Sequence, residues 1–263
     1  MLKLYSYRFK MFFKYRFLLQ NLIQRDIKVK YRRSTLGIMW SVLNPLLMMI
    51  VLTMVFSFAF KNDIENYPVY LLSGQLLFTY FTESSSMAME SVISYAPLIK
   101  KVYVPKYLFP LEKSCFSFIN MCFSLIALLT VMVVTRAPFH LTMFLAVYPL
   151  VTLFFFSLGV GLFLSSAAIF FRDIIHLWSV FTTALMYASA IFYPTNILDG
   201  TIMQILINFN PLYWYIDAFR QVVLRGEMFS FNHVLICALC AVVAMFVGLK
   251  TFKKGQDNFI LYI

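Results

Sequence analysis

Side chains that could do chemistry are sparse in this 263-residue chain and do not assemble into a catalytic set. His140, His176 and His233 stand far apart, and no H-E-x-x-H pattern gives them metal-ligand spacing. Cys237 and Cys240 have the C-x-x-C spacing of a metal or redox pair, but no second pair accompanies them. No G-x-x-x-x-G-K-[ST] loop is present to cradle the phosphates of ATP. The sequence therefore predicts no enzyme site and no metal site, and cysteines that pack as small hydrophobic side chains.

A few charged residues interrupt apolar stretches and are better candidates for function. Glu83 and Glu90 are seven residues apart, so a helix would place them on one face. Acids inside a membrane usually face a bundle interior or a water-filled cavity. Glu83 and Glu90 therefore either line the mouth of a pathway, paired with an arginine of the N-terminal segment, or lie in water beyond the end of their helix. Asp217 and Arg220 have the i,i+3 spacing of a helical ion pair.

The composition is that of an all-α integral membrane protein. Hydrophobic residues make up 62% of the chain, charged residues only 13%, and the mean hydropathy is +0.81, against about 45–50% and about 25% in soluble domains. Continuous apolar runs of about 20 residues are long enough to cross a bilayer as helices, and they are not the alternating runs of a β-barrel. They predict six transmembrane helices, at residues 36–60, 69–89, 114–135, 141–170, 174–192 and 231–249.

The distribution of positive charge predicts the orientation of these helices. With the N-terminus inside, 18 of the 22 Lys and Arg residues fall on the cytoplasmic side and four fall outside. Such a bias predicts that both termini are cytoplasmic. The net charge of +11 then serves topology and contact with anionic membrane lipids, and no nucleic-acid partner is needed to explain it. The first 35 residues are too basic and too interrupted for a cleavable signal peptide.

Residues 1–35 are predicted to form a cytoplasmic amphipathic segment, ahead of a six-span domain at 36–263. Phe9, Phe12, Phe13 and Phe17 recur at helical spacing, and basic residues fill the other face. That pattern is typical of a helix lying in the plane of the lipid headgroups. The alternative is a simple positively charged anchor for the first span.

The cytoplasmic loop 94–111 is the first of two unusual connections. It contains Pro97, Pro105 and Pro110, and the first two leave room for about two helical turns, at 98–104, bearing Lys100 and Lys101. A proline starts such a helix well and a later proline ends it. A short basic helix on the cytoplasmic face could dock a soluble partner. The alternative is a loop that only sets topology.

The external segment 194–226 is the second. A short apolar stretch at 199–207 precedes Asn210-Pro211, a strong helix start, and a helix at 212–224 closes at Gly226. Neither helix is long enough to cross the membrane, so both are expected to dip in from outside and return, packed against protein. The aromatic residues at 213–215 suit the membrane interface.

Three segments, RDIKVKYRRSTLGIMWSVLNPL, APLIKKVYVPKYLFPL and NPLYWYIDAFRQVVLRG, follow the amphipathic helix in this order. Together they resemble the membrane (permease) subunit of a type-2 ABC exporter, in the branch of O-antigen, capsule and teichoic-acid export permeases. The resemblance implies a transport subunit in the bacterial cytoplasmic (inner) membrane, not an enzyme, that forms a homodimer. It also implies two separate ATP-binding subunits, which bind ATP and Mg²⁺, so that this chain needs no cofactor. The substrate would be a lipid-linked polysaccharide or a teichoic acid.

The resemblance also assigns roles to residues. The coupling helix that docks on the ATPase would contain Leu98, Ile99, Lys100, Lys101 and Val102. The interface helix that gates the cytoplasmic entrance would contain Arg25, Lys28, Arg32 and Arg33. The re-entrant helices that close the external end would contain Pro211, Tyr213, Trp214, Asp217 and Arg220.

Aromatic residues, 19% of the chain, add candidates for the lining of the pathway, because aromatic faces pack well on sugar rings. Together with the two acids, the candidate lining residues are Tyr80, Phe81, Glu83, Glu90, Trp178, Tyr187 and Tyr193. The alternative for each aromatic residue is ordinary helix packing or an interfacial belt.

Three other functions remain open. An ABC exporter of a drug, peptide or lipid often has a large external domain or a fused ATPase, and the sequence predicts neither here. An integral-membrane transferase for lipid-linked sugars would need a carboxylate or histidine constellation in a loop. A passive channel is the third possibility, and ATPase activity that rises when the chain is reconstituted with an ATP-binding partner would exclude both the transferase and the channel.

Overall fold

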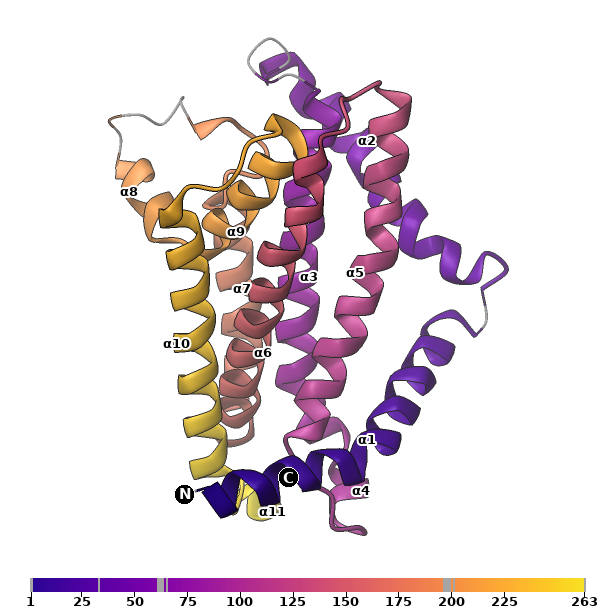
Figure 1. The fold of residues 1–263 in the computed structure, drawn as a ribbon. Coiled ribbons are helices and arrows are strands. Elements are labelled where there is room, and N and C mark those ends of the chain that lie inside the picture. Colours follow the sequence, from indigo (N-terminus) through magenta and orange to yellow (C-terminus); the bar gives the residue numbers. More distant parts are fainter. Residues whose placement is uncertain are drawn as a thin grey trace.

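The computed structural model is all-helical over the residues that it describes, which are 2–32, 34–60, 64, 66–195, 200 and 202–262 (Figure 1). The long helices are α1 (Leu2–Tyr31), α2 (Trp40–Phe60), α3 (Tyr67–Ser94), α5 (Leu108–Val134), α6 (Val147–Phe170) and α10 (Phe231–Gly255). The shorter ones are α4 (Ala96–Ile99), α7 (Ile174–Tyr187), α8 (Ile202–Phe209), α9 (Pro211–Arg220) and α11 (Phe259–Tyr262). Short 3-10 turns precede α2 (Gly37–Met39) and α6 (Leu141–Ala146), and a π-helical turn (Gln221–Arg225) extends α9.

Four helical stretches in the described chain are long and apolar enough to cross a membrane: Gly37–Phe56, Leu108–Val134, Leu141–Phe170 and Phe231–Gly255. They match the predicted first, third, fourth and sixth spans. The protein is therefore a multi-pass membrane protein. The predicted second span lies within α3, whose 28 residues give a length of about 42 Å. The fifth was predicted too long, because α7 has only 14 residues and ends at Tyr187 instead of 192.

Helix α3 is the centre of the bundle, packed against α2, α5, α6, α7 and α9 (Figure 1). Its apolar and its small polar side chains are both fully buried, as at Leu72, Ala88 and Ser84. Helix α2 is the opposite case, since Met54 and Val55 are 66% and 63% exposed. An exposed apolar face of this kind suits hydrocarbon or a second membrane subunit.

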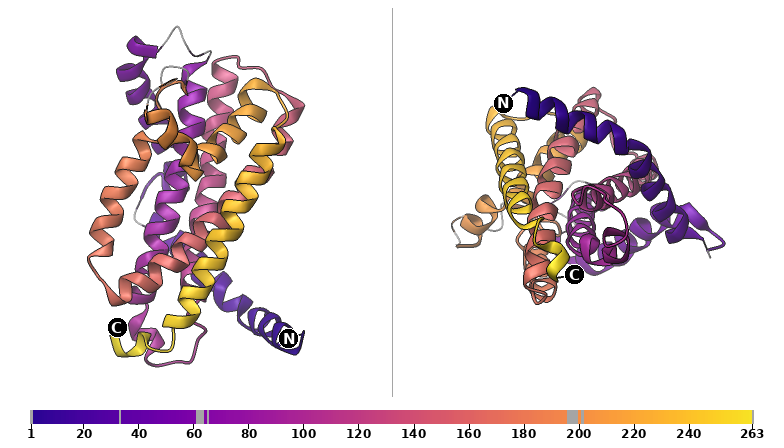
Figure 2. Two further views of the ribbon diagram at one scale, coloured as in Figure 1. Left: turned by 90° about the vertical axis from the view of Figure 1, so that its left-hand side faces the viewer. Right: turned by 90° about the horizontal axis from the view of Figure 1, so that it is seen from below.

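Helices α6 and α10 cross at two glycines and run side by side (Figure 2). A Cβ atom on Gly159 would lie 2.5 Å from the backbone nitrogen of Met245, and one on Gly248 would press on the carbonyl oxygen of Gly159. Only residues without a side chain allow two membrane helices to approach so closely. This contact fixes α10 against the core.

The N-terminal amphipathic segment is one continuous helix from Leu2 to Tyr31. It crosses the end of the bundle that carries α4 and α11, here called the α4 end, and then rises beside α5 (Figures 1 and 2). Leu19 and Leu22 pack against the bundle, whereas Phe13 and Phe17 are 48% and 62% exposed. One apolar stripe therefore docks on protein and another faces outward. The side chains of Phe9 and Phe12 lie outside the described residues.

The two unusual connections lie at opposite ends of the bundle. At the α4 end, α4 is a single turn with Pro97 in its first turn, and the last helical bond runs from the Val102 N–H to the Leu98 carbonyl. The predicted helix at 98–104 is therefore too long and starts too late, since α4 runs from Ala96 to Ile99. The end of the predicted stretch is disfavoured because Val104 directly precedes Pro105. At the other end, here called the α9 end, α8 and α9 contain eight and ten residues, too few to span a bilayer.

Candidate functional site

A cluster of charged groups attaches α1 to the bundle at the α4 end. Lys113 on α5 donates a hydrogen bond to Asp26 on α1, and Arg25 donates to Asp26 at 2.7 Å and to the Tyr95 hydroxyl. That hydroxyl donates in turn to Glu112 at 3.3 Å, a side chain with no exposed surface. Tyr95 is the residue that joins α3 to α4. This interface-helix cluster therefore connects α1, α5 and the start of α4.

The Asp26 carboxyl is held in its charged form. Burial alone would raise its pKa, but the hydrogen bonds from Lys113 and Arg25 outweigh burial and leave the pKa below its ordinary value. Of the other predicted gate residues, Lys28 and Arg32 are exposed, and Arg33 lies outside the described residues. Asp26, Tyr95, Glu112 and Lys113 were not predicted as functional, since nothing in their local spacing shows that they meet.

A second contact joins the end of α1 to the middle of α3. The Lys30 ammonium lies 2.8 Å from the Glu83 carboxylate, and the Tyr31 hydroxyl donates to the Asn120 side chain at 3.4 Å. Glu83 thus pairs with a basic residue of the N-terminal helix, although with a lysine and not with the expected arginine. Glu90 is exposed and is not part of this contact.

A groove of about 950 Å³ opens beside this contact, between the end of α1, α2, α3 and α5. It follows α3 from Met87 to Gln75, a rise of about 18 Å along the helix. Its walls combine aromatic rings, amides and hydroxyls on an apolar surface. They include Tyr31, Trp40, Ser41, Asn44, Gln75, Phe78, Thr79, Tyr80, Glu83, Asn120 and Ser124. Such a surface can pack on sugar rings and exchange hydrogen bonds with hydroxyl groups.

The structure divides the candidate lining residues into two sets. Tyr80 and Glu83 border the groove. Phe81 and Trp178 instead pack on each other in the core with ring centroids 6.0 Å apart, and the Trp178 indole N–H donates to Ser85 at 3.2 Å. Glu90 and Tyr187 are exposed elsewhere, and Tyr193 lies near the α9 end. Trp40, Asn44 and Asn120 were not among the candidates, because their position in the groove depends on how the helices pack.

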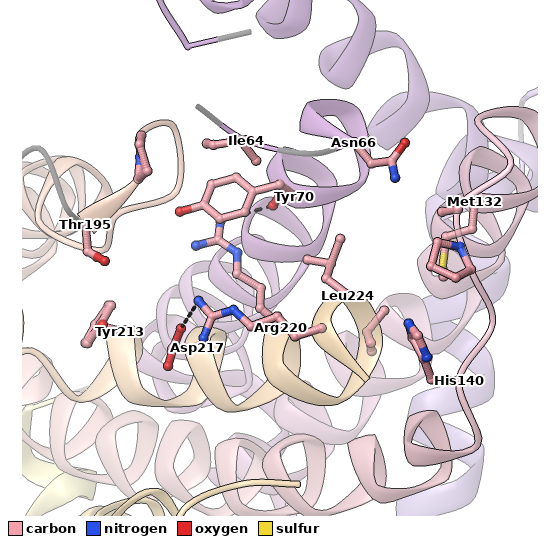
Figure 3. Close-up of a pocket in the computed structure, with 15 residues that line it drawn as sticks. Ile64, Asn66, Tyr70, Met132, His140, Thr195, Tyr213, Asp217, Arg220 and Leu224 are labelled. Atoms are coloured by element: carbon pink, nitrogen blue, oxygen red, sulfur yellow. Dashed lines mark hydrogen bonds and ion pairs between the residues drawn. The ribbon is translucent and has the colours of Figure 1, made fainter. Parts of the chain in front are cut away.

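A second cavity, of about 600 Å³, lies at the α9 end (Figure 3). Tyr213, Asp217 and Arg220 line it from α9, as does Arg225 from the turn that follows. Asn210 caps α9 as predicted, with its side-chain oxygen accepting from the Leu212 N–H at 3.0 Å. We call this cavity the outer pocket. Its remaining lining comes from the same π-helical turn, from the ends of α3 and α5 with the loops beside them, and from the chain after α7.

Two of the predicted external-gate residues do not line the outer pocket. Pro211 occupies the first turn of α9. The Trp214 indole N–H donates to the Asn208 carbonyl at 2.8 Å, and its ring packs against His233 with centroids 5.0 Å apart.

The expected ion pair between Asp217 and Arg220 is wrong. Asp217 instead lies 3.3 Å from Arg225 and 3.0 Å from His233, and accepts a hydrogen bond from Gln221. Arg225 reaches Asp217 because the π-helical turn after Arg220 changes the register of the side chains. His233 comes from α10, which spacing within α9 cannot reveal. Arg220 points away, toward α3 (Figure 3).

Arg220 is a cation that is only 2% exposed. Its guanidinium donates to the carbonyl oxygens of Ala190 at 2.9 Å, Ile191 at 3.1 Å and Tyr70 at 3.0 Å, and it lies 3.5 Å from the centre of the Tyr70 ring. A buried charge must be compensated, and here carbonyl dipoles just past the end of α7 and an aromatic face do so. These bonds link α9 to α3 and to the chain after α7.

Other side chains bind the same stretch after α7. The Asn210 amide donates to the Ala188 carbonyl at 3.0 Å and to the Ser189 hydroxyl at 2.8 Å. The Tyr67 hydroxyl donates to the Phe192 carbonyl at 2.9 Å. Helix α7 therefore ends early because tertiary partners take up the carbonyl groups that follow it, which is why the fifth span was predicted too long.

The coupling loop at the α4 end is partly exposed and partly anchored. Lys100, Lys101 and Val102 are exposed, Leu98 is half-buried and Ile99 is buried in the core. Farther along the loop, Lys106 donates a hydrogen bond to the Gln256 carbonyl, between α10 and α11. The exposed surface is thus a small basic knob on a loop that is held at both ends.

These features define a multi-pass helical membrane protein with a long polar and aromatic groove and a separate pocket at one end. Residues 18–224 match the protein-family model of the ABC-2 type transporter. Because this match covers more than half of the chain, the protein belongs to the ABC-2 type transporter family.

Curated relatives are similar over nearly the whole chain. The chain is 27% identical to the O-antigen export system permease protein RfbA of Klebsiella pneumoniae, over 92% of this chain and 93% of the relative. It is 26% identical to RfbA of Myxococcus xanthus, over 94% and 95%. It is 22% identical to the polysialic acid transport protein KpsM of Escherichia coli, over 90% and 92%.

Proposed function

We propose that this protein is the permease subunit of an ATP-driven exporter that moves a lipid-linked polysaccharide, of the O-antigen or capsule kind, across the bacterial cytoplasmic membrane. The observation that carries this proposal is the groove of about 950 Å³ along α3, lined by aromatic and amide side chains, in a chain whose relatives export such polymers. A polymer that slides needs many weak contacts and no tight site, and a long mixed surface provides them.

The transporter would be a homodimer with two ATP-binding subunits. We place the α4 end and both termini in the cytoplasm, with α3 and α7 as the second and fifth of six spans. The bias of 18 against four basic residues supports this orientation, because Lys100 and Lys101 then face the cytoplasm. Lys100, Lys101 and Val102 form the exposed part of the coupling helix, while Leu98 and Ile99 fix it to the bundle.

The interface-helix cluster transmits the conformational change of the ATP-binding subunits to α1. ATP binding by the partner subunits displaces α4, and Tyr95 moves with it because it joins α3 to α4. Tyr95 holds Arg25, and Lys113 holds Asp26, so α1 follows the movement. The contact between Lys30 and Glu83 then breaks, and the mouth of the groove opens. In this mechanism α1 is a gate, and the residues at the α9 end open last.

Reconstitution tests the proposal directly. The protein is purified with its ATP-binding partner and placed in proteoliposomes. The candidate substrates are lipid-linked O-antigen, capsular polymer and teichoic acid, and a hydrophobic drug represents the competing substrate class. The expected result is ATP-dependent movement of a polysaccharide together with faster ATP hydrolysis. Movement of the drug alone, or of no substrate while ATP hydrolysis stays unchanged, would contradict the proposal. Movement of teichoic acid alone would refute the polysaccharide assignment but keep the exporter.

A further inference from the structure

The groove and the outer pocket are separated by one short stretch of chain, residues 188–193, which we call the partition. Ile191 lines the groove, whereas Thr195, just beyond the partition, lines the outer pocket. On α3, Gln75 lines the groove and Tyr70 the outer pocket, five residues or about 7.5 Å away along the helix. A path from the groove to the outer pocket therefore has to pass the partition.

The partition is filled by aromatic rings on its groove side. The Phe192 ring stacks on Phe56 of α2 with centroids 5.2 Å apart, and it also contacts Tyr187 at 6.1 Å. Ala190 within it has a φ of +47°, a conformation that a residue other than glycine adopts only when its surroundings impose it. The partition is thus held in place by other parts of the chain.

Among the described residues, Arg220 is the charged side chain that donates hydrogen bonds to the partition, at the carbonyls of Ala190 and Ile191. The other anchors there are the neutral groups of Tyr67, Tyr70 and Asn210. Arg220 also bonds to Tyr70 on α3, so one guanidinium joins α9, α3 and the partition. Asp217, the acid three residues before Arg220, pairs with Arg225 and His233 instead of with Arg220.

We infer that Arg220 is a positioning residue that keeps the partition closed between the groove and the outer pocket. A tilt of α9 pulls the guanidinium from the carbonyls of the partition. The partition is then free to move aside and let the polymer pass. This inference deepens the proposed function and rests on it for the direction in which the polymer moves. The role of Arg220 in the closed state is inferred from its contacts with the partition and does not depend on which substrate is exported.

The shape of the site requires an arginine and a glycine together. The planar guanidinium presents five N–H donors in a fixed fork, which reaches carbonyls on two elements at once, whereas a lysine ammonium is a point charge. Gly74 gives the fork its space, since a Cβ there would lie 2.6 Å from Nη2 of Arg220. Glycine is unfavourable within a helix, and the space that the Arg220 guanidinium needs explains why one is present at position 74.

Cysteine labelling in intact cells tests the inference. Thr79, an exposed groove residue, is replaced by Cys in a variant that lacks the four native cysteines, and a membrane-impermeant maleimide is added from outside. In the absence of export, the Cys at position 79 in Thr79→Cys is expected to react slowly with the maleimide. The additional change Arg220→Ala is expected to raise this labelling rate at least about tenfold, because it increases the population of the open partition. Arg220→Lys falls between the two. Arg225→Ala, which also alters the outer pocket, is the matched control and leaves the rate slow.

Two further measurements keep the result interpretable. If Arg220→Ala does not accumulate in the membrane, Gly74→Ala displaces the guanidinium without removing it and must raise labelling as well. Guanidinium ions added to a folded Arg220→Ala variant should lower its labelling rate again, which a general loosening of the fold would not show. Unchanged labelling in the folded Arg220 or Gly74 variants overturns the inference. Labelling needs neither substrate nor ATPase, so it succeeds or fails independently of the proposed polymer.

Discussion

Asp26 on the N-terminal helix accepts a hydrogen bond from Lys113 on α5, across 87 residues of sequence. The Asp26 side chain is 11% exposed and that of Lys113 is 12% exposed, so water screens this pair only partly. It holds α1 to the bundle at the position where α4 begins. A proton on Asp26 would remove its charge and weaken this attachment.

We therefore predict a pH dependence for the attachment of α1. The pKa of folded Asp26 is below its ordinary value of about 3.9, so its contribution is complete above that pH and is lost as the pH falls through the folded pKa. The protection factors of the α1 amides, which are exchange rates corrected for the intrinsic pH dependence of amide exchange, should therefore stay constant from about pH 8 to 5. These protection factors should fall only below about pH 4, when Asp26 takes up a proton.

Asp26→Asn tests the same contact at neutral pH. Loss of the charge should cost about 2 kcal/mol of local attachment, the usual range for a hydrogen bond to a charged group. The observable is faster amide exchange in the second half of α1, with exchange in α10 unchanged. Equal protection of α1 in the wild type and the variant would show that the bond to Lys113 does not hold the helix.

The pair of Lys30 and Glu83 is predicted to serve transport more than stability. Their side chains are 39% and 28% exposed, and pairs this exposed contribute about 0–1 kcal/mol. Lys30→Glu should therefore leave thermal unfolding almost unchanged and reduce export. The exchanged variant, Lys30→Glu with Glu83→Lys, should restore export; if it exports no better than Lys30→Glu alone, the pair is not the functional unit.

The basic knob of the coupling loop is predicted to act on the ATPase. Lys100→Glu with Lys101→Glu reverses two exposed charges and should uncouple ATP hydrolysis from export without loss of folded protein. The matched control is Lys254→Glu, an exposed lysine at the same end of the bundle. Export assayed beside ATP hydrolysis checks the effect, and normal export by the double variant would refute the coupling role.

The crossing of α6 and α10 is predicted to be the least tolerant packing contact. Gly248→Leu places a side chain against the backbone of Gly159 and should destabilise the protein by about 2 kcal/mol or more. Leu239→Ala, an exposed change on the same helix, should stay within about 0.5 kcal/mol. Thermal unfolding in detergent measures both, and equal melting temperatures would contradict the close approach of the two helices.

The sequence by itself determined the features that depend on local composition and spacing. Apolar runs located the long helices, Asn210-Pro211 located the start of α9, Pro97 the start of α4, and three ordered segments pointed to the family. These predictions succeeded because hydropathy and helix capping act over a few residues, within reach of a pattern along the chain.

The tertiary structure decided which polar groups meet. Helix α7 ends at Tyr187, although its apolar run continues, because Arg220 and Asn210 bind the carbonyl groups beyond it. Asp217 pairs with Arg225 and His233 across a π-helical turn, and Asp26 finds Lys113 at a distance of 87 residues. In an apolar bundle a buried polar group is stabilised by whichever partner the packing brings near it, and that partner follows from the arrangement of the helices in space.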